Sequence, residues 1–82
     1  MKFLIELTDL FCGEPNYSWV ERYVVEANTV NDAMRIFSAY HDAEWILYFA
    51  NNEYSQFISD NNVCVFVQAS GDEDLSTYRQ LD

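Results

Sequence analysis

A single stretch of this chain repeats its apolar residues at the spacing of an α-helix, which limits what the rest can form. The repeating residues are Val30, Ala33, Met34, Phe37 and Tyr40. Thr29, followed by Asp32 three positions later, resembles a capping box with Asp in place of Glu. We therefore expect one helix of about three turns that ends at His41 and packs against a sheet.

The N-terminal part of the chain has the pattern of two strands. Residues 3–7 alternate at the period of a strand with one buried face. Residues 17–27 are rich in aromatic and β-branched side chains, with Trp19, Tyr23 and Val25 on one side. Residues 9–16 contain the only proline and one of the two glycines, and they predict a loop that joins the strands into a hairpin.

Three shorter runs follow the helix. Residues 45–49 are too few and too apolar for periodicity to separate a buried strand from a helical segment, and a strand is favoured. Residues 54–58 predict a short strand between turn signals at residues 51–53 and 60–62. Residues 63–69 are apolar on both faces, which is typical of a central strand.

These elements predict an α+β fold in the order β-β-α-β-(β)-β, with an antiparallel sheet of four to five strands and one packed helix. The 82 residues fit a single domain, 1–82. Because 50% of the residues are hydrophobic and 17% are aromatic, a disordered acidic chain is excluded. Residues 75–82 are expected to form a last half-turn against the core or to fray, in which case residues 71–82 are a loosely ordered acidic tail.

The cysteines and the N-terminal residues indicate the compartment. Cys12 and Cys64 lie in apolar contexts, and a single pair is a poor disulfide framework, so both are expected to be free, buried thiols. Glu6 interrupts the apolar start where a signal peptide would continue, and no run approaches the ~20 apolar residues of a membrane span. We expect a cytoplasmic protein that does not bind membranes.

The sequence contains no catalytic or cofactor motif. A Cys–His nucleophile would need Cys12 or Cys64 beside His41, but an apolar strand and acidic neighbours both disfavour a thiolate. Zinc would need clustered ligands at a characteristic spacing that the sequence does not offer. Asp72 and Asp74 have the alternate spacing of a calcium loop without the glutamate that closes it. We expect no enzyme activity, no cofactor and no metal site.

The net charge of the chain indicates which kind of partner it would attract. The chain has fourteen acidic and four basic side chains, which give a formal net charge of -10. The candidate partner-binding residues are Glu14, Glu21, Glu26, Asp42, Glu44, Asp72, Glu73 and Asp74. On one face they would imitate phosphates and be attracted to a basic nucleic-acid-binding groove. Otherwise they are the solvated faces of a sheet and a helix.

The aromatic side chains offer a second kind of interface. Tyrosine and tryptophan are common hot spots of protein interfaces, although a chain this short needs most of its large side chains in the core. The candidates are Tyr17, Trp19, Tyr23, Trp45, Tyr48 and Tyr54. If they are exposed, a homodimer that pairs sheet edges or aromatic patches is the alternative to an acidic binding surface.

Residues 7–20, Leu-Thr-Asp-Leu-Phe-Cys-Gly-Glu-Pro-Asn-Tyr-Ser-Trp-Val, resemble a motif of small uncharacterised proteins of bacteriophages and prophages. Those proteins carry Gly-Gly-Glu-Ala-Asn-Tyr-Ser-Trp-Val after a first strand and then basic residues. Here Cys12 and Pro15 replace Gly and Ala, and Glu21 stands where a basic residue is common. A weaker similarity runs through the helix and the final strand. The resemblance implies a phage origin and carries no known function.

Within the motif, local structure accounts for most residues. Asn16 is expected to bond its own backbone, and Tyr17 and Trp19 to anchor the loop to the core. Glu14 then stays available to a partner.

A phage origin suggests a function by analogy of size and composition. Small acidic phage proteins include anti-CRISPR proteins and restriction inhibitors that mimic DNA. We therefore expect a non-enzymatic inhibitor in the host cytoplasm, which binds a nuclease or CRISPR surveillance complex and no nucleic acid itself. The alternative is a small self-associating assembly module whose acidic residues confer solubility.

Overall fold

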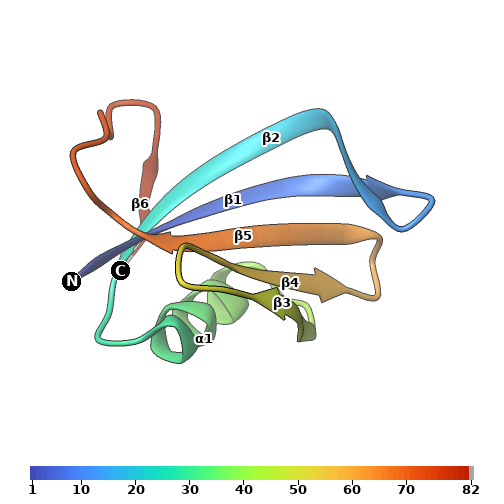
Figure 1. Cartoon of the computed structure of the whole chain (residues 1–82), viewed down its shortest axis with the longest axis horizontal. Coiled ribbons are helices and arrows are strands. Elements are labelled where there is room, and N and C mark those ends of the chain that lie inside the picture. Colours follow the sequence, from blue (N-terminus) through green and yellow to red (C-terminus); the bar gives the residue numbers. More distant parts are fainter. Residues whose placement is uncertain (82) are drawn as a thin grey trace.

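The computed structural model describes residues 1–81 and has an α+β fold: one helix packs on one face of a six-stranded sheet (Figure 1). Its elements are β1 (Lys2–Phe11), β2 (Glu14–Glu26), α1 (Val30–Tyr40), β3 (Trp45–Ala50), β4 (Ser55–Ser59), β5 (Val63–Ala69) and β6 (Arg79–Leu81). The strand order is β3-β4-β5-β1-β2-β6. The predicted fold class, the single helix and the strand at residues 45–49 are confirmed.

The sheet differs from the prediction at its C-terminal edge. It has six strands, and β6 pairs with β2 in parallel, with Leu81 opposite Val25, while the other pairs are antiparallel. Residues 79–81 are thus part of the sheet, with Leu81 buried, and do not form a loose tail; the final residue of the predicted tail lies outside the described residues. Burial of Leu81 in the core stabilises this short pairing.

The helix begins where its capping residues predict. The Asp32 backbone N–H donates to Thr29 Oγ1 at 3.1 Å, and the side chain of Phe37 lies fully buried against the sheet. Tyr23 meets Phe37 edge to face, with ring centroids 5.4 Å apart. Tyr40, expected on the apolar face, is 48% exposed. Residues 1–81 contain no helix with the length and apolar character that crossing a bilayer requires.

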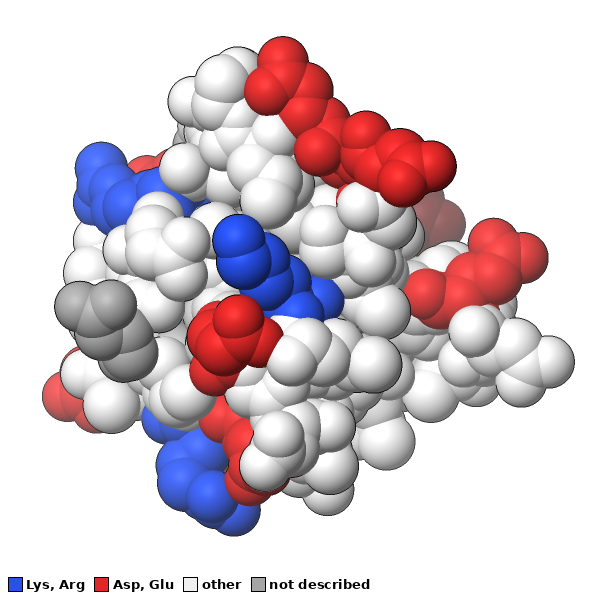
Figure 2. All heavy atoms as spheres, turned by 90° about the vertical axis from the view of Figure 1, so that its left-hand side faces the viewer, with Lys and Arg blue, Asp and Glu red and all other residues white. Residues whose placement is uncertain are grey.

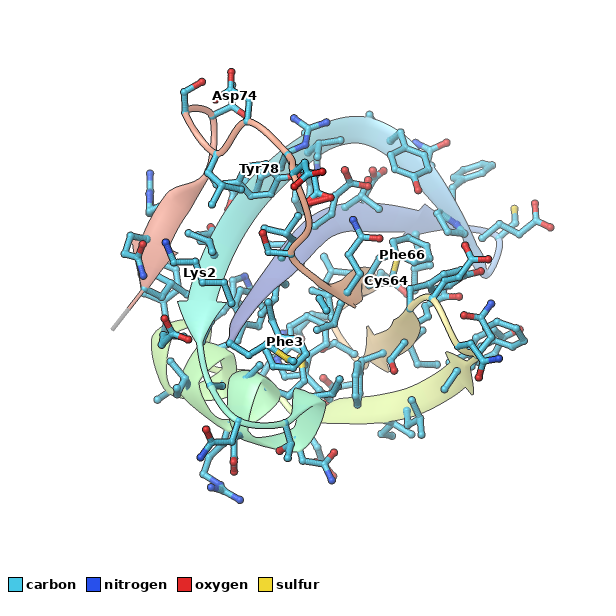
Figure 3. The ribbon with its side chains drawn as sticks, turned by 60° about the vertical axis from the view of Figure 1, so that its left-hand side comes forward. Lys2, Phe3, Cys64, Phe66, Asp74 and Tyr78 are labelled. Carbon is cyan, nitrogen blue, oxygen red and sulfur yellow. The ribbon has the colours of Figure 1, made fainter. Side chains whose placement is uncertain are left out.

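The core lies between α1 and the sheet face that carries alternate residues of each strand. The core residues are Phe3, Ile5, Leu7, Tyr23, Val25, Ala33, Met34, Phe37, Phe57, Val65, Val67 and Leu81. The intervening residues of β1 and β5, including Glu6 and Phe66, lie on the opposite face of the sheet, which we call the open face. The connection from β5 to β6, which carries Asp74 and Tyr78, lies beside one end of the sheet (Figure 3).

The hairpin of β1 and β2 is longer than its sequence predicts. The loop expected over residues 9–16 shrinks to a turn at Cys12 and Gly13, whose φ angles are 54° and 81°. Gly13 adopts this left-handed conformation without strain. The register of the two strands shifts between Thr8 and Leu10, so that residues 16–19 of β2 bulge out of the pairing.

Candidate protein-binding site

The predicted acidic residues lie in separate parts of the molecule. Glu14 and Glu26 are the first and last residues of the 13-residue strand β2, at opposite ends of the hairpin. Asp42 and Glu44 lie between α1 and β3, and residues 72–74 lie between β5 and β6. On the face in Figure 2, acidic side chains form separate groups with uncharged and basic surface between them. Residues 72–74 lie together as chain neighbours.

Residues 72–74 form an ordered acidic loop. The Gly71 backbone N–H donates to Glu73 Oε1 at 2.6 Å, and the Ser76 N–H donates to Asp74 Oδ1 at 3.0 Å. The hydrogen bonds from the Ser76 backbone and side chain lower the pKa of Asp74. Asp74 therefore stays ionised at neutral pH and on into mildly acidic solution.

Ion pairs neutralise little of the acidic surface. Among the candidate carboxylates of the described chain, Glu26 alone forms an ion pair, with the N-terminal ammonium group. The hydrogen bond from this group lowers the pKa of Glu26. Glu21 accepts a hydrogen bond from the Tyr23 hydroxyl, whose pKa is raised chiefly by burial. Ion pairs therefore leave most of the negative charge of the described residues uncompensated.

Asp9 organises the bulge of residues 16–19, which we call the Asp9 bulge. Asp9 Oδ2 accepts from Asn16 Nδ2 at 2.9 Å and from Ser18 Oγ at 2.7 Å, and Oδ1 accepts from the Ser18 backbone N–H at 3.0 Å. The side-chain hydrogen bonds from Ser18 and then Asn16 lower the pKa of Asp9 to about 2. The sequence analysis missed this role of Asp9.

Thr8 fastens the same bulge from within the sheet. Its fully buried hydroxyl donates to the Trp19 carbonyl oxygen at 2.9 Å and accepts from the Tyr17 backbone N–H at 3.1 Å. Tyr17 is thereby held at a φ of 57°, which a non-glycine residue rarely adopts.

The Asp9 bulge displays the aromatic residues of the motif. Tyr17 and Trp19 are 52% and 41% exposed, so the prediction that they anchor the loop to the core is wrong. The prediction for Asn16 is also wrong, because its side chain binds Asp9. Burial first, and then Glu6, Cys64 and Tyr54, raise the pKa of Tyr17.

The open face contains a hollow of about 160 Å³. Its lining residues are Leu4, Glu6, Tyr54, Phe66, Gln68 and Tyr78. Glu6 stands opposite Phe66 across the β1–β5 pairing, and Tyr54 meets Phe66 edge to face with ring centroids 5.7 Å apart. Glu6 Oε2 lies 3.3 Å from Arg22 Nε, and the Glu6 side chain is 32% exposed. The hollow thus combines aromatic walls with a carboxylate.

Strand β3 is an exposed apolar edge. It pairs with β4 alone, and four consecutive residues, Ile46, Leu47, Tyr48 and Phe49, are between 45% and 64% exposed. The strand prediction holds, but its expected burial is wrong. Of the other candidate aromatics, Tyr23 is buried, whereas Trp45 and Tyr54 are half-buried. A register shift between Leu47 and Phe49 bends the strand without adding a charge that would protect it.

The groups weighed for catalysis do not converge. Cys64 is buried and free, as predicted, and burial raises the pKa of its thiol. Cys12 is free but exposed, contrary to prediction, because it lies in the hairpin turn. His41 stacks on Phe37 with ring centroids 5.7 Å apart, on the helix side of the sheet. Within residues 1–81 no three side chains of metal-binding type form a cluster.

Comparisons with protein families, with curated proteins and with solved structures found no match to this chain. Three features of its surface bear on its function: the acidic loop of residues 72–74, the hollow on the open face and the apolar edge of β3.

Proposed function

We propose that the protein is a non-enzymatic, phage-encoded inhibitor that binds a basic nucleic-acid-binding surface of a host defence protein. The target is a nuclease or a CRISPR surveillance complex, and carboxylates replace the phosphates of the nucleic acid. The supporting observation is the net charge of -10: within residues 1–81 only Glu6, Glu26 and Asp32 among the carboxylates form an ion pair. Such a field speeds encounter with a basic groove and repels nucleic acid.

Residues 72–74 are the strongest phosphate surrogates. Asp74 is kept ionised by Ser76, and all three side chains belong to exposed residues. The more distant carboxylates contribute mainly long-range attraction, which is screened over ~8 Å at physiological ionic strength.

The test is capture of partners from a host lysate at low and high salt, with the retained proteins identified by mass spectrometry. We expect a nucleic-acid-binding defence protein that is retained at low salt, released at high salt and displaced by DNA. The double variant Asp72→Asn/Asp74→Asn should weaken capture at least tenfold. The control Glu53→Gln/Asp60→Asn, with the same change of charge at other exposed residues, should weaken it much less. Capture that ignores salt and DNA would overturn the proposal.

The apolar edge of β3 supports a second candidate, self-association. Taking roughly 200 Å² for a large side chain, the exposed fractions of residues 46–49 leave about 450 Å² per copy. A symmetric pair would bury about 900 Å², slightly less than the ~1,000 Å² above which an interface is typically specific, so the association would be weak. No charged residue lies within β3, so two copies of this acidic chain can meet there with least repulsion.

Sedimentation equilibrium tests the second candidate. We expect a dimer that Leu47→Lys converts to a monomer, because a lysine on the edge opposes strand pairing. Phe11→Lys is the control, since Phe11 is 67% exposed at the far end of the hairpin. A wild-type monomer at high micromolar concentration would exclude self-association through β3.

A further inference from the structure

We propose that the hollow on the open face binds the guanidinium group of an arginine side chain presented by a protein partner. The inference rests on the proposed function, because it names the chemical group by which a basic partner is recognised. It adds a defined site to the diffuse attraction of the carboxylates. The argument depends on the shape of the hollow, its single lining carboxylate and an arginine contact that this chain makes elsewhere.

The walls of the hollow suit a flat, apolar-faced cation. Glu6 and Phe66 form one cross-strand pair of its floor, and Leu4 and Gln68 form the next. Tyr54 lies against Phe66, and Tyr78 lines the hollow from the β5–β6 connection (Figure 3). Aromatic faces attract cations, and a guanidinium group stacks on them more readily than an ammonium group.

The charge of the hollow selects a cation. Glu6 is the only charged side chain in its lining, and within the described residues its ion-pair contact is a single one, between Oε2 and Arg22 Nε at 3.3 Å. Oε1 is left to accept from a second guanidinium group. The Glu6 side chain is only 32% exposed, so a cation that reaches it is partly removed from water and bound more strongly than at the surface.

Polar atoms around the rim complete the recognition. The hydroxyls of Tyr54 and Tyr78 and the amide of Gln68 make no hydrogen bond in the part of the chain that the structure describes. Their oxygens can accept from the five N–H groups of an arginine. A lysine has three donors on a compact head and no planar face for the ring of Phe66.

The chain already binds one of its own arginines in this manner. The Arg79 guanidinium lies 5.8 Å from the centroid of the Tyr23 ring and donates to the Tyr40 hydroxyl at 2.6 Å. The hollow offers the same groups, aromatic rings and tyrosine hydroxyls, with a carboxylate in addition. Lys2 and Arg22 are cations on the open face, and neither lines the hollow.

Nuclear magnetic resonance titration of the full chain tests the proposal. The probe is acetyl-Gly-Arg-Gly-amide, and its neutral counterpart contains citrulline, which has nearly the same shape. We expect the arginine peptide to shift the backbone amides of Glu6, Phe66 and Gln68 with millimolar affinity, and the citrulline peptide to have no effect. The lysine peptide should bind at least threefold more weakly.

Matched variants distinguish binding in the hollow from attraction by the overall negative charge of the protein. Glu6→Gln and Phe66→Leu should each weaken the arginine peptide at least fivefold, whereas Asp60→Asn, with the same change of charge in the exposed turn between β4 and β5, should leave it unchanged. Thermal unfolding establishes that each variant is folded. If Glu6→Gln is unfolded, the proposal is tested with Phe66→Leu, which keeps an apolar side chain. Equal binding of citrulline, or equal loss in Asp60→Asn, would overturn the proposal.

The two proposals fail in different ways. If the arginine peptide does not bind and Asp72→Asn/Asp74→Asn still abolishes capture of a defence protein, the hollow is refuted and the proposed function stands. If the peptide binds and capture ignores salt and DNA, the hollow stands as an arginine site and the proposed function is refuted.

Discussion

Thr8→Val measures how strongly the sheet holds the Asp9 bulge. Valine keeps the volume of threonine and removes the hydroxyl, so the Tyr17 N–H and the Trp19 carbonyl lose their partner. Each hydrogen bond contributes about 1 kcal/mol net, so we expect a loss of about 2 kcal/mol in the free energy of unfolding. For a domain of this size, that lowers the melting temperature by roughly 8–16 °C.

The assay is urea unfolding followed by tryptophan fluorescence, with thermal unfolding as a second probe. Thr77→Val is the control, because Thr77 is exposed and makes no side-chain hydrogen bond in the described chain. Its effect should stay within about 0.5 kcal/mol. If Thr8→Val is equally mild, the hydroxyl does not hold the bulge and the reasoning is refuted.

Three further predictions concern the bulge, the core and the thiols. Because the pKa of Asp9 is lowered from 3.8 to about 2 in the folded chain, the stability it contributes is present above about pH 4 and lost as the pH falls through 2. Asp9→Asn should flatten that part of the curve of unfolding free energy against pH, and an unchanged curve would contradict the assignment. Phe37→Ala should cost about 3–5 kcal/mol in urea unfolding, since Phe37 is fully buried, and a cost below about 1 kcal/mol would contradict its place in the core. Cys12 should react with a thiol reagent in the native protein and Cys64 only after unfolding, and rapid labelling of both would contradict the burial of Cys64.

The parts of the fold that depend on neighbouring residues were predictable from the sequence. The helix follows from a cap and a spacing contained in residues 29–41, and both are observed. Strand β5 follows from its apolar faces, and it does lie between β4 and β1. Local preference and tertiary packing agree in these elements.

The remainder depends on contacts between distant residues. Strand β6 has three residues, too few for any period, and exists because it pairs with β2. The apolar run of β3 predicts a buried strand, but in the observed strand order β3 lies at the edge of the sheet. Asp9 accepts hydrogen bonds from residues seven and nine positions away. The bulge that these bonds hold exposes Tyr17 and Trp19 at the surface.

The candidate site was predictable in its chemistry and not in its geometry. The excess of carboxylates is plain from composition, but their separation along β2 and between loops is not. Glu6 was not among the predicted binding residues, because its place in an alternating strand gives no sign of the aromatic residues around it. Those residues come from β5 and from the segments before β4 and β6.

The position of β1 in the middle of the sheet has a consequence for the protein while it is being synthesised. The hairpin of β1 and β2 is complete once residue 26 has left the ribosome, but the other edge of β1 waits for β5, which ends at Ala69. At ~5–20 residues per second, that edge stays open for roughly two to nine seconds. During this interval β1 is a template for any extended chain nearby, and rapid closure by β5 decides the yield of folded protein.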